Sequence, residues 1–363
     1  MDIVVIGSGC FGSWIAYSLA ERGHNVTLVD SHGPGNNRSS SGGETRIIRM
    51  SYGGDAIYTR MSHESLERWK RMFVECDENL FIESGALLTT HDDEARLEAA
   101  AATLARYNIR HQKLKSNELK KRFPQFAFDP GTTGLFEPDS GTLLSRRAVE
   151  CVAKAAERIG VKRISMTAQP STIKKKIPAE RYIFACGAWL PTLFPKELGS
   201  TIFPTRQELF FFGVPNDSFA SPHMPAWFDA LSGFYSVPDV EHRGFKLGID
   251  DHGPPANPET IDRVVTEKGI AKARAFVAKR FPALKDAPIT ESRVCVYENT
   301  WNGDFLIDEL KPGIWIAGGG SGHGFKHGPA VGRYTADVIE GRIPPEPRFQ
   351  LTSKRTKQSR RVY

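Results

Sequence analysis

A glycine pattern in the first thirty residues allows few folds for the start of the chain. An apolar run, Ile3–Ile6, leads directly into Gly-x-Gly-x-x-Gly at residues 7–12. The next stretch, Ser13–Arg22, has the apolar spacing of one helix face, and a second apolar run follows at Val26–Val29. The pattern therefore predicts a strand, a glycine turn, a helix and a second strand, which together form a βαβ unit.

Each glycine of this turn has a physical reason. Gly7 allows the tight turn, Gly9 lets a pyrophosphate approach the backbone, and Gly12 lets the helix pack closely on the strand. The helix N-terminus then offers unpaired N–H groups and a partial positive charge to the phosphates. Asp30 ends the second strand, where a carboxylate can accept hydrogen bonds from ribose hydroxyls. The acid favours an unphosphorylated ribose, so the unit predicts FAD or NAD rather than NADP.

The other end of the chain contains a second glycine-rich turn. A buried strand is expected at Ile314–Ala317, followed by the turn Gly318–Gly324 and a helix that begins near Pro329. An NAD enzyme usually completes its nucleotide fold before the catalytic domain begins. Here half of the nucleotide site returns after a strand-rich middle, which favours FAD and a cofactor domain that is interrupted in the sequence.

The predicted fold class is therefore mixed α/β. We expect a discontinuous Rossmann-like FAD-binding domain of the glutathione-reductase type and a substrate domain built on an antiparallel sheet. The cofactor domain is assigned residues 1–80, 142–203 and 302–345, the substrate domain residues 81–141 and 204–301, and a basic tail residues 346–363.

Local patterns lead to further expectations outside the nucleotide motif. The runs Phe81–Thr90 and Gly134–Leu144 are each expected to form a strand. Asp92 is expected to cap an Ala-rich helix, and Asn257 to open a helix that reaches about Arg280. The chain after about Arg342 is rich in Pro and then basic, which predicts a mobile tail.

Cysteine usage and charge restrict the class of protein. The five cysteines are widely spaced without a C-x-x-C pair, so we expect neither a zinc site, nor any other metal site, nor a disulfide framework. The net charge of +6 indicates a solvated basic surface, or a surface that attracts anionic substrates or RNA. No apolar run reaches the length of a membrane span, and the start of the chain lacks a signal-peptide pattern, which favours the cytoplasm.

Three longer segments carry a resemblance to a known family. They are Ser-Ser-Ser-Gly-Gly-Glu-Thr-Arg-Ile-Ile-Arg from Ser39, the segment from Cys295 to Asp308, and Gly-Gly-Gly-Ser-Gly-His-Gly-Phe-Lys ending at Lys326. With the 7–12 motif, they resemble the monomeric sarcosine oxidase family of D-amino-acid-oxidase-like FAD amine oxidases. N-methyltryptophan oxidase, pipecolate oxidase and the fructosyl amino acid oxidases are relatives. The similarity covers nearly the whole chain in order.

The resemblance implies roles for individual residues. Cys295 matches the family cysteine that holds the flavin through a thioether. Arg49 and Lys326 match the pair that binds the substrate carboxylate, and Arg46 matches an arginine close to the flavin. Lys246 matches a lysine above the flavin that promotes the reaction with oxygen.

The candidate site has two sets of residues. The catalytic candidates are Arg46, Arg49, Lys246, Asp250, Tyr297 and Lys326. The cofactor-binding candidates are Gly7, Gly9, Cys10, Phe11, Gly12, Asp30, Ser31, Ser40, Thr45, Arg46, Cys186, Gly187, Trp189, Cys295, Gly320, Gly322, His323, Gly324, Phe325 and Lys326. Asp250 departs from the sarcosine oxidases, which carry histidine at this position. An acid at this position is similar to the pattern of the fructosyl amino acid oxidases, and it puts sarcosine itself in doubt as the substrate.

The resemblance implies a monomeric, FAD-dependent oxidase of a secondary amine or N-substituted amino acid. A hydride equivalent passes to the flavin, the imine hydrolyses in water, and O2 accepts the electrons as hydrogen peroxide. A fructosyl amino acid (Amadori) oxidase and a dehydrogenase with another electron acceptor are alternatives. From other classes, a tRNA-modifying or RNA-binding flavoprotein and a non-catalytic scaffold are weaker alternatives. Nucleic acid and membranes are not expected as partners.

Overall fold

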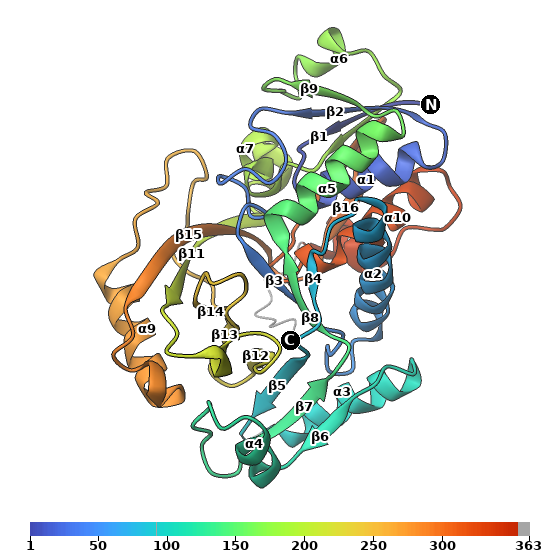
Figure 1. The fold of residues 1–363 in the computed structure, drawn as a ribbon. Coiled ribbons are helices and arrows are strands. Elements are labelled where there is room, and N and C mark those ends of the chain that lie inside the picture. Colours follow the sequence, from blue (N-terminus) through green and yellow to red (C-terminus); the bar gives the residue numbers. More distant parts are fainter. Residues whose placement is uncertain (92, 355–363) are drawn as a thin grey trace.

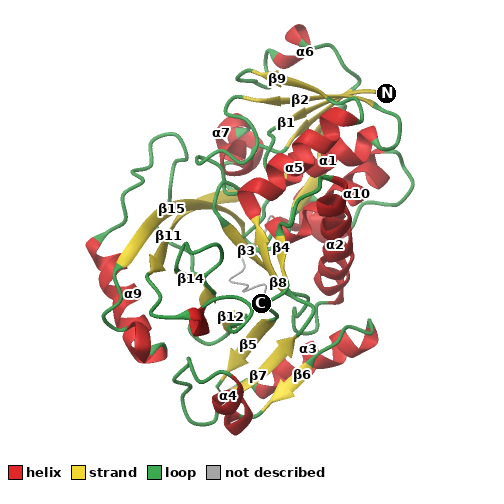
Figure 2. Ribbon diagram, viewed as in Figure 1, coloured by secondary structure: helices red, strands yellow, loops and turns green. Residues whose placement is uncertain are grey.

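Three sheets with surrounding helices form the protein, as the computed structural model of residues 1–91 and 93–354 shows (Figures 1 and 2). The six-stranded sheet has the order β16-β17-β10-β1-β2-β9 in this part of the chain. All its neighbours pair in parallel except β16 with β17. Its strands are β1 (Asp2–Ile6), β2 (Asn25–Asp30), β9 (Lys162–Ser165), β10 (Arg181–Phe184), β16 (Leu306–Lys311) and β17 (Ile314–Gly318).

Helices from both ends of the chain pack together beside this sheet (Figure 1). They are α1 (Cys10–Ala20), α2 (Ala56–Glu75), α5 (Ser145–Arg158) and α10 (Gly328–Ile339). Trp14 of α1 meets Trp69 of α2 edge to face, with ring centroids 5.0 Å apart. A Cβ atom at Gly332 of α10 would lie 2.4 Å from the Trp14 carbonyl oxygen, so the two helices touch backbone to backbone.

The eight-stranded sheet is mainly antiparallel and has the order β15-β11-β14-β13-β12-β5-β7-β6 in the described chain. Only β12 and β5 pair in parallel among these neighbours. Aromatic rings fill the core beside it, including Phe126, Trp227 and Phe281. Its strands are β5 (Ala86–Thr90), β6 (Gln112–Leu114), β7 (Thr133–Glu137), β11 (Ile202–Phe212), β12 (Ala226–Asp229), β13 (Phe234–Val237), β14 (Phe245–Ile249) and β15 (Ile289–Thr300).

A small third sheet lies between the two large ones and consists of β3 (Thr45–Ile48), β8 (Gly141–Leu144) and β4 (Phe81–Ile82) (Figure 1). It corrects two expectations, because Phe81–Thr90 and Gly134–Leu144 are each split between this sheet and the eight-stranded sheet. The chain turns at Gly85, with φ +74°, and between β7 and β8 the Ser140 N–H donates to the Glu137 carbonyl. The predicted division into two domains stays a prediction.

The remaining helices are short or lie at the periphery. They are α3 (Glu94–Arg106), α4 (Ser116–Arg122), α6 (Ile173–Lys176), α7 (Leu190–Leu193), α8 (Pro195–Leu198) and α9 (Glu267–Arg280), with 3₁₀ turns that include η1 (Gly187–Trp189) and η4 (Phe325–His327). No helix in the described ranges is both long and apolar enough to cross a membrane.

One predicted helix start, at Asn257, is wrong, and another, at Asp92, lies outside the described residues. The helix expected from Asn257 begins ten residues later, at Glu267, because the Thr266 hydroxyl accepts from the Gly269 N–H at 3.0 Å and caps it. The preceding loop instead carries Glu259, which bonds Trp189. Asp93 caps α3, whereas Asp92 lies outside the described residues.

The described part of the predicted mobile tail is bound to the rest of the protein. The Arg348 guanidinium pairs with Asp55 at 2.7 Å and with Asp304 at 2.6 Å. The buried Lys354 ammonium donates to the Asn302 side chain at 3.0 Å. The expectation of a mobile tail is therefore wrong for residues 346–354, because its basic residues bond to acceptors in the core; residues 355–363 lie outside the described chain.

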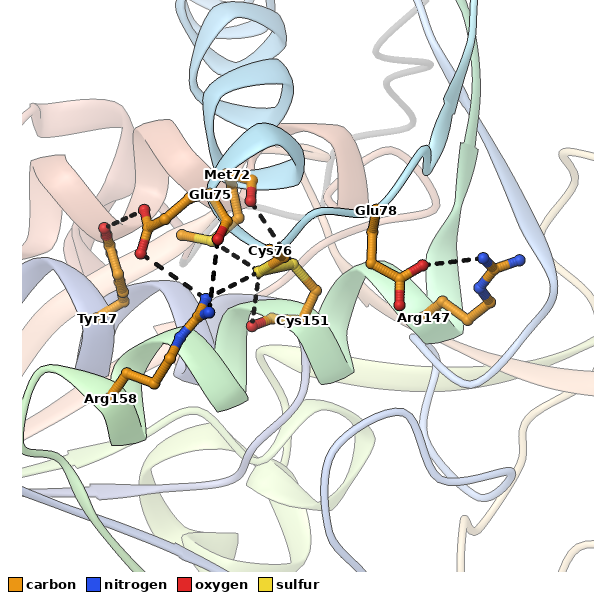
Figure 3. Close-up of a disulfide and its surroundings, with 8 residues drawn as sticks. All are labelled: Tyr17, Met72, Glu75, Cys76, Glu78, Arg147, Cys151 and Arg158. Carbon is orange, nitrogen blue, oxygen red and sulfur yellow. Dashed lines mark hydrogen bonds and ion pairs between the residues drawn. A yellow bond between two sulfur atoms is a disulfide. The ribbon is translucent and has the colours of Figure 1, made fainter.

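A disulfide joins Cys76, at the end of α2, to Cys151 in α5 (Figure 3). Arg158 lies beside the bridge, 3.3 Å from the Cys76 sulfur, and forms an ion pair with Glu75. This finding corrects the expectation of no disulfide. The two cysteines are 75 residues apart in the sequence and become neighbours only when α2 packs on α5.

Reduction of this disulfide is expected to destabilise the protein. A bridge between residues so far apart restricts the unfolded chain, so Cys76→Ser should lower the free energy of unfolding by about 2–4 kcal/mol. Urea unfolding with and without dithiothreitol measures the effect. The reductant should lower the wild-type midpoint to that of the variant and leave the variant unchanged; labelling of all five thiols in unreduced, unfolded protein would contradict the bridge.

Candidate active site

A large cavity lies along the carboxyl ends of the parallel strands, the usual position of a nucleotide in such a sheet. It has a volume of about 410 Å³. It runs from the turn after β1 past Asp30 and the η1 turn to Tyr297 and the glycine turn after β17. Both ends of the chain therefore contribute walls to one cavity.

The first glycine turn is shaped by close backbone contacts. Gly7 has φ +101°, and a Cβ atom there would lie 2.4 Å from the Ala185 carbonyl oxygen. A Cβ atom at Gly12 would lie 1.7 Å from the Gly7 carbonyl oxygen. Gly9 differs, since its Cβ would meet only the Ser41 hydroxyl at 3.4 Å, and it lines the cavity. The first and third glycines thus serve packing, while the second leaves space for a ligand.

Asp30 is held in place at the cavity wall by backbone amides. One carboxylate oxygen accepts from the Ser8 N–H at 2.7 Å. The other accepts from the N–H groups of His32 and Gly33 at 2.7 and 2.8 Å. These bonds fix the direction of the carboxylate at the end of β2. A carboxylate offers about four acceptor positions, so it can still accept from a ligand hydroxyl.

The predicted cofactor-binding residues divide between this cavity and a smaller pocket. Gly12 lines neither space and lies beneath the turn. Thr45, Cys295, His323 and Lys326 line only the smaller pocket. The larger cavity is lined by Gly7, Gly9, Cys10, Phe11, Asp30, Ser31, Ser40, Arg46, Cys186, Gly187, Trp189, Gly320, Gly322, Gly324 and Phe325.

The smaller pocket, of about 80 Å³, adjoins the cavity and shares lining residues with it. Arg46, Tyr297, Gly322 and Phe325 belong to both. All six predicted catalytic residues line the smaller pocket, although they come from β3 and the residue after it, from β14 and its end, from β15 and from η4. The structure therefore brings these residues together next to the end of the cavity.

Two buried cations, Arg49 and Lys326, face this pocket. The Arg49 guanidinium lies over the Tyr52 ring, 5.0 Å from its centroid, and donates to the Ser51 carbonyl. The Lys326 ammonium donates to the His323 carbonyl at 3.0 Å. Burial, and then the charge of Arg49, lower the pKa of Lys326 well below its usual range.

The segment that carries Arg49 is fixed by a buried acid. The Glu137 carboxylate accepts from the backbone N–H groups of Met50 at 2.7 Å and Ser51 at 3.0 Å. It also accepts from the Ser140 hydroxyl at 2.8 Å. These bonds hold the backbone beyond β3, so that the position of Arg49 depends on the β7–β8 turn.

A second group of polar residues surrounds Thr45, which lines the same pocket. The Lys246 ammonium donates to the Thr45 carbonyl at 2.7 Å, and the Arg46 guanidinium donates to the same oxygen at 2.7 Å. Burial, and then Arg46, lower the pKa of Lys246 well below its usual range. The Cys295 sulfur lies 3.9 Å from the Ser40 carbonyl oxygen and lines the same pocket.

His323 is buried in a hydrogen-bonded cluster. Its Nε2 lies 3.0 Å from the Gly303 carbonyl, which can only accept, so Nε2 carries the hydrogen. Its Nδ1 then accepts from the Tyr52 hydroxyl at 3.2 Å. The same hydroxyl is 2.8 Å from His327 Nε2, and burial lowers the pKa of His327 well below its usual range. Burial therefore favours the neutral imidazole of His327.

Sequence reasoning missed several residues that the structure places at the site. Tyr52 lies under both cations of the smaller pocket, and Glu298 lines the larger cavity. Each is close in sequence to a recognised position, since Tyr52 follows Arg49 by three residues and Glu298 follows Tyr297. The segment 166–169 also lines the cavity without any motif that indicates it. The described residues contain no metal-type cluster of three or more His, Cys, Asp or Glu.

The two roles of glycine in the first turn can be separated by mutation. Gly12→Ala is expected to destabilise the fold by about 1–3 kcal/mol or more, since its methyl group overlaps the Gly7 carbonyl. Gly9→Ala should unfold at nearly the wild-type temperature and instead weaken dinucleotide binding. Thermal unfolding and retained cofactor, measured on both variants, test this; equal loss of stability in both would contradict it.

Comparison with known proteins agrees with this geometry. Residues 2–338 match the model of the family DAO, FAD dependent oxidoreductase. The chain is 29% identical over 358 residues to monomeric sarcosine oxidase of Bacillus sp. (strain B-0618), covering 93% of this chain and 91% of that protein. It is 27% identical to N-methyl-L-tryptophan oxidase of Salmonella typhi, covering 97% of each.

A solved structure supports the same fold. The structure of fructosyl amine: oxygen oxidoreductase (Amadoriase I) from Aspergillus fumigatus has a TM-score of 0.78 at 20% sequence identity, covering 99% of this chain and 92% of that one. This similarity concerns the fold alone, whereas the family model spans nearly the entire described chain. The protein belongs to the DAO family of FAD-dependent oxidoreductases.

Proposed function

We propose that the protein is an oxidase of secondary amines or N-substituted amino acids that passes electrons through FAD to O2 and forms hydrogen peroxide. The observation that carries the proposal is the pair of buried cations, Arg49 and Lys326, in a small pocket beside the cofactor cavity. Two cations in such a place suit a substrate carboxylate. Relatives named for sarcosine and for N-methyl-L-tryptophan support an N-methyl amino acid as substrate.

The walls of the larger cavity suit FAD. Gly7 and Gly12 allow the close strand–helix turn, Gly9 leaves room for a pyrophosphate, and Asp30 offers a fixed acceptor for ribose. When bound, FAD supplies the acceptor for a hydride equivalent from the carbon beside the amine nitrogen. The protein contributes binding, orientation and charge.

The carboxylate of the substrate would bind between the two cations. Arg49 offers a planar fork for two parallel hydrogen bonds, and Lys326 adds a point charge. The pKa of Lys326 is lowered by burial and by Arg49. A bound anion opposes both effects by favouring the ammonium form, so substrate binding keeps Lys326 protonated.

Asp250 favours a second candidate, a fructosyl amino acid oxidase. Its charge acts on Lys326 and Tyr52, and it lines the pocket. A carboxylate there can accept hydrogen bonds from a polyhydroxylated or cationic substrate group. The fold of Amadoriase I agrees with this reading, at lower sequence identity than the amino acid oxidases named above.

We further propose that Cys295 forms a thioether to the flavin, that Lys246 promotes the reaction with oxygen, and that the enzyme is a cytoplasmic monomer. Cys295 and Lys246 line the same pocket. Burial lowers the pKa of Lys246, and a nearby negative charge would favour its ammonium form. The Cys76–Cys151 disulfide argues against the cytoplasmic location, because disulfides rarely persist in a reducing compartment.

Two further readings make different predictions. A dehydrogenase would remain reduced when air is admitted after anaerobic reduction by substrate, whereas an oxidase reoxidises within seconds. An RNA-binding flavoprotein would show salt-dependent tRNA binding. The basic composition of the tail would support RNA binding. Arg348 and Lys354 weaken this support, because their side chains bond within the protein.

Arg49→Lys tests the carboxylate site. The variant keeps the charge but loses the fork, so KM for sarcosine and other N-methyl amino acids should rise about 10- to 100-fold, the value of one charge-assisted hydrogen bond. An amine without a carboxylate should be affected little. Peroxide release measures both. Arg68→Lys, whose guanidinium pairs with Glu21, is the matched control. An equal rise in KM for substrates with and without a carboxylate would contradict carboxylate binding by Arg49. If the wild type releases no peroxide with any secondary amine, the proposed function is contradicted.

The covalent bond is tested separately. Acid-precipitated wild-type protein should retain yellow flavin in the pellet, and Cys295→Ser should release it into the supernatant while still binding FAD before precipitation. Cys186→Ser, a cysteine in the cavity wall, should retain the pellet colour. A colourless wild-type pellet would contradict the thioether and leave FAD dependence intact.

A further inference from the structure

One carboxyl oxygen of Glu298 has no hydrogen-bond partner within the described chain. Glu298 lies near the end of β15 and lines the larger cavity. Its Oε1 accepts from the Gly320 N–H at 3.3 Å. Its Oε2 is shielded from solvent and forms no hydrogen bond within the described chain. Buried polar atoms are almost always paired, so this oxygen indicates a partner that binds in the cavity.

Glycines surround the Glu298 carboxyl group. A Cβ atom at Gly318 would lie 3.2 Å from Oε2, and one at Gly320 would lie 3.2 Å from Oε1. A Cβ atom at Gly187, in the η1 turn, would lie 3.6 Å from Oε2. The carboxyl group thus lies between two glycine turns from distant parts of the chain, in the cavity that extends from the Gly7–Gly12 turn to the smaller pocket.

Burial favours the neutral form of Glu298. Burial raises its pKa to about 7, and the amides of Gly320 and Gly319 oppose this only in part. The strand that pairs with it, β11, places uncharged Pro204 opposite. The other titratable or charged groups that line the cavity are Cys10, Asp30, His32, Arg46, Cys186, Glu259 and Tyr297. Among them, the Cys186 thiol interacts with both Asp30 and Glu298 and has a raised pKa, chiefly through burial.

We propose that Glu298 enters the FAD complex as the neutral acid and donates its proton from Oε2 to an oxygen of the cofactor's pyrophosphate or ribityl chain. Oε1 is already an acceptor, so the proton belongs on Oε2. An ionised carboxylate would repel the negative pyrophosphate and could donate nothing. FAD binding therefore takes up a proton when the pH lies above the pKa of Glu298 in the free protein.

The test uses the full chain with Cys295→Ser, so that FAD binds reversibly. Flavin fluorescence gives Kd for FAD between pH 6 and pH 8.5. Below about pH 7 the acid is already protonated and Kd should be constant. Above it, Kd should rise about tenfold per pH unit, because protonation must accompany binding. Adding Glu298→Gln, which keeps the shape and a donor, should remove the rise.

A matched acid in the same wall serves as control. Glu259 lines the cavity but pairs with Arg38 and Trp189, which lower its pKa, so Glu259→Gln should keep the parental pH dependence. A rise that survives Glu298→Gln would assign the proton to another group such as His32 and overturn the proposal. A Kd that is constant with pH in the parent would overturn it as well.

Two further measurements complete the design. Calorimetry of the parent at pH 8, in buffers of different ionisation enthalpy, should show uptake of close to one proton per FAD; no uptake would overturn the proposal without any Glu298 variant. If Kd for ADP depends on pH as Kd for FAD does, the acceptor oxygen belongs to the pyrophosphate. If Kd for ADP does not depend on pH, the acceptor oxygen belongs to the ribityl chain. Failure of any of these would leave the proposed amine oxidation untouched.

Discussion

The close contact between α1 and the six-stranded sheet is the constraint on which the other parts of the site depend. With glycine at position 12, the helix lies against the Gly7 carbonyl, closer than any side chain permits. The helix start is thereby directed at the cavity. On its other side, α1 touches α10 at Gly332, and α10 follows directly on the turn that carries Lys326. One tightly packed helix thus sets the distance between the first glycine turn and the turn that lines the smaller pocket.

Burial gives the small pocket its chemical character. In water, cations such as Arg49 and Lys326 would be solvated and would attract an anion weakly. Here they lie among aromatic rings and backbone carbonyls, and the pKa of Lys326 is lowered first by burial and then by the charge of Arg49. An anionic ligand opposes both effects. If the pocket binds a substrate carboxylate as proposed, the same desolvation of the two cations would give selectivity for a negatively charged group.

Much of the fold was readable from the sequence because its signals are local. The glycine spacing, the apolar runs around it and the later glycine turn predicted the βαβ unit and the discontinuous nucleotide site, and the family relationship agrees with them. The Cys76–Cys151 bridge, the binding of Arg348 to Asp55 and the unpaired Glu298 oxygen were not readable, since each depends on distant segments that meet only after folding. The prediction of one strand over Gly134–Leu144 was wrong for a related reason, because apolar content does not reveal that the chain changes its partner strand.

The attachment of the C-terminal segment has a consequence for biosynthesis. Arg348 connects the beginning of α2, through Asp55, with the loop before β16, through Asp304, and Lys354 bonds to the same loop. A ribosome makes the Gly7–Gly12 turn long before it makes Arg348 and Lys354, so these contacts form after both glycine turns have been made. The walls of the larger cavity come from residues between Ile6 and Phe325, so the nascent protein cannot form this cavity until the second glycine turn has been made.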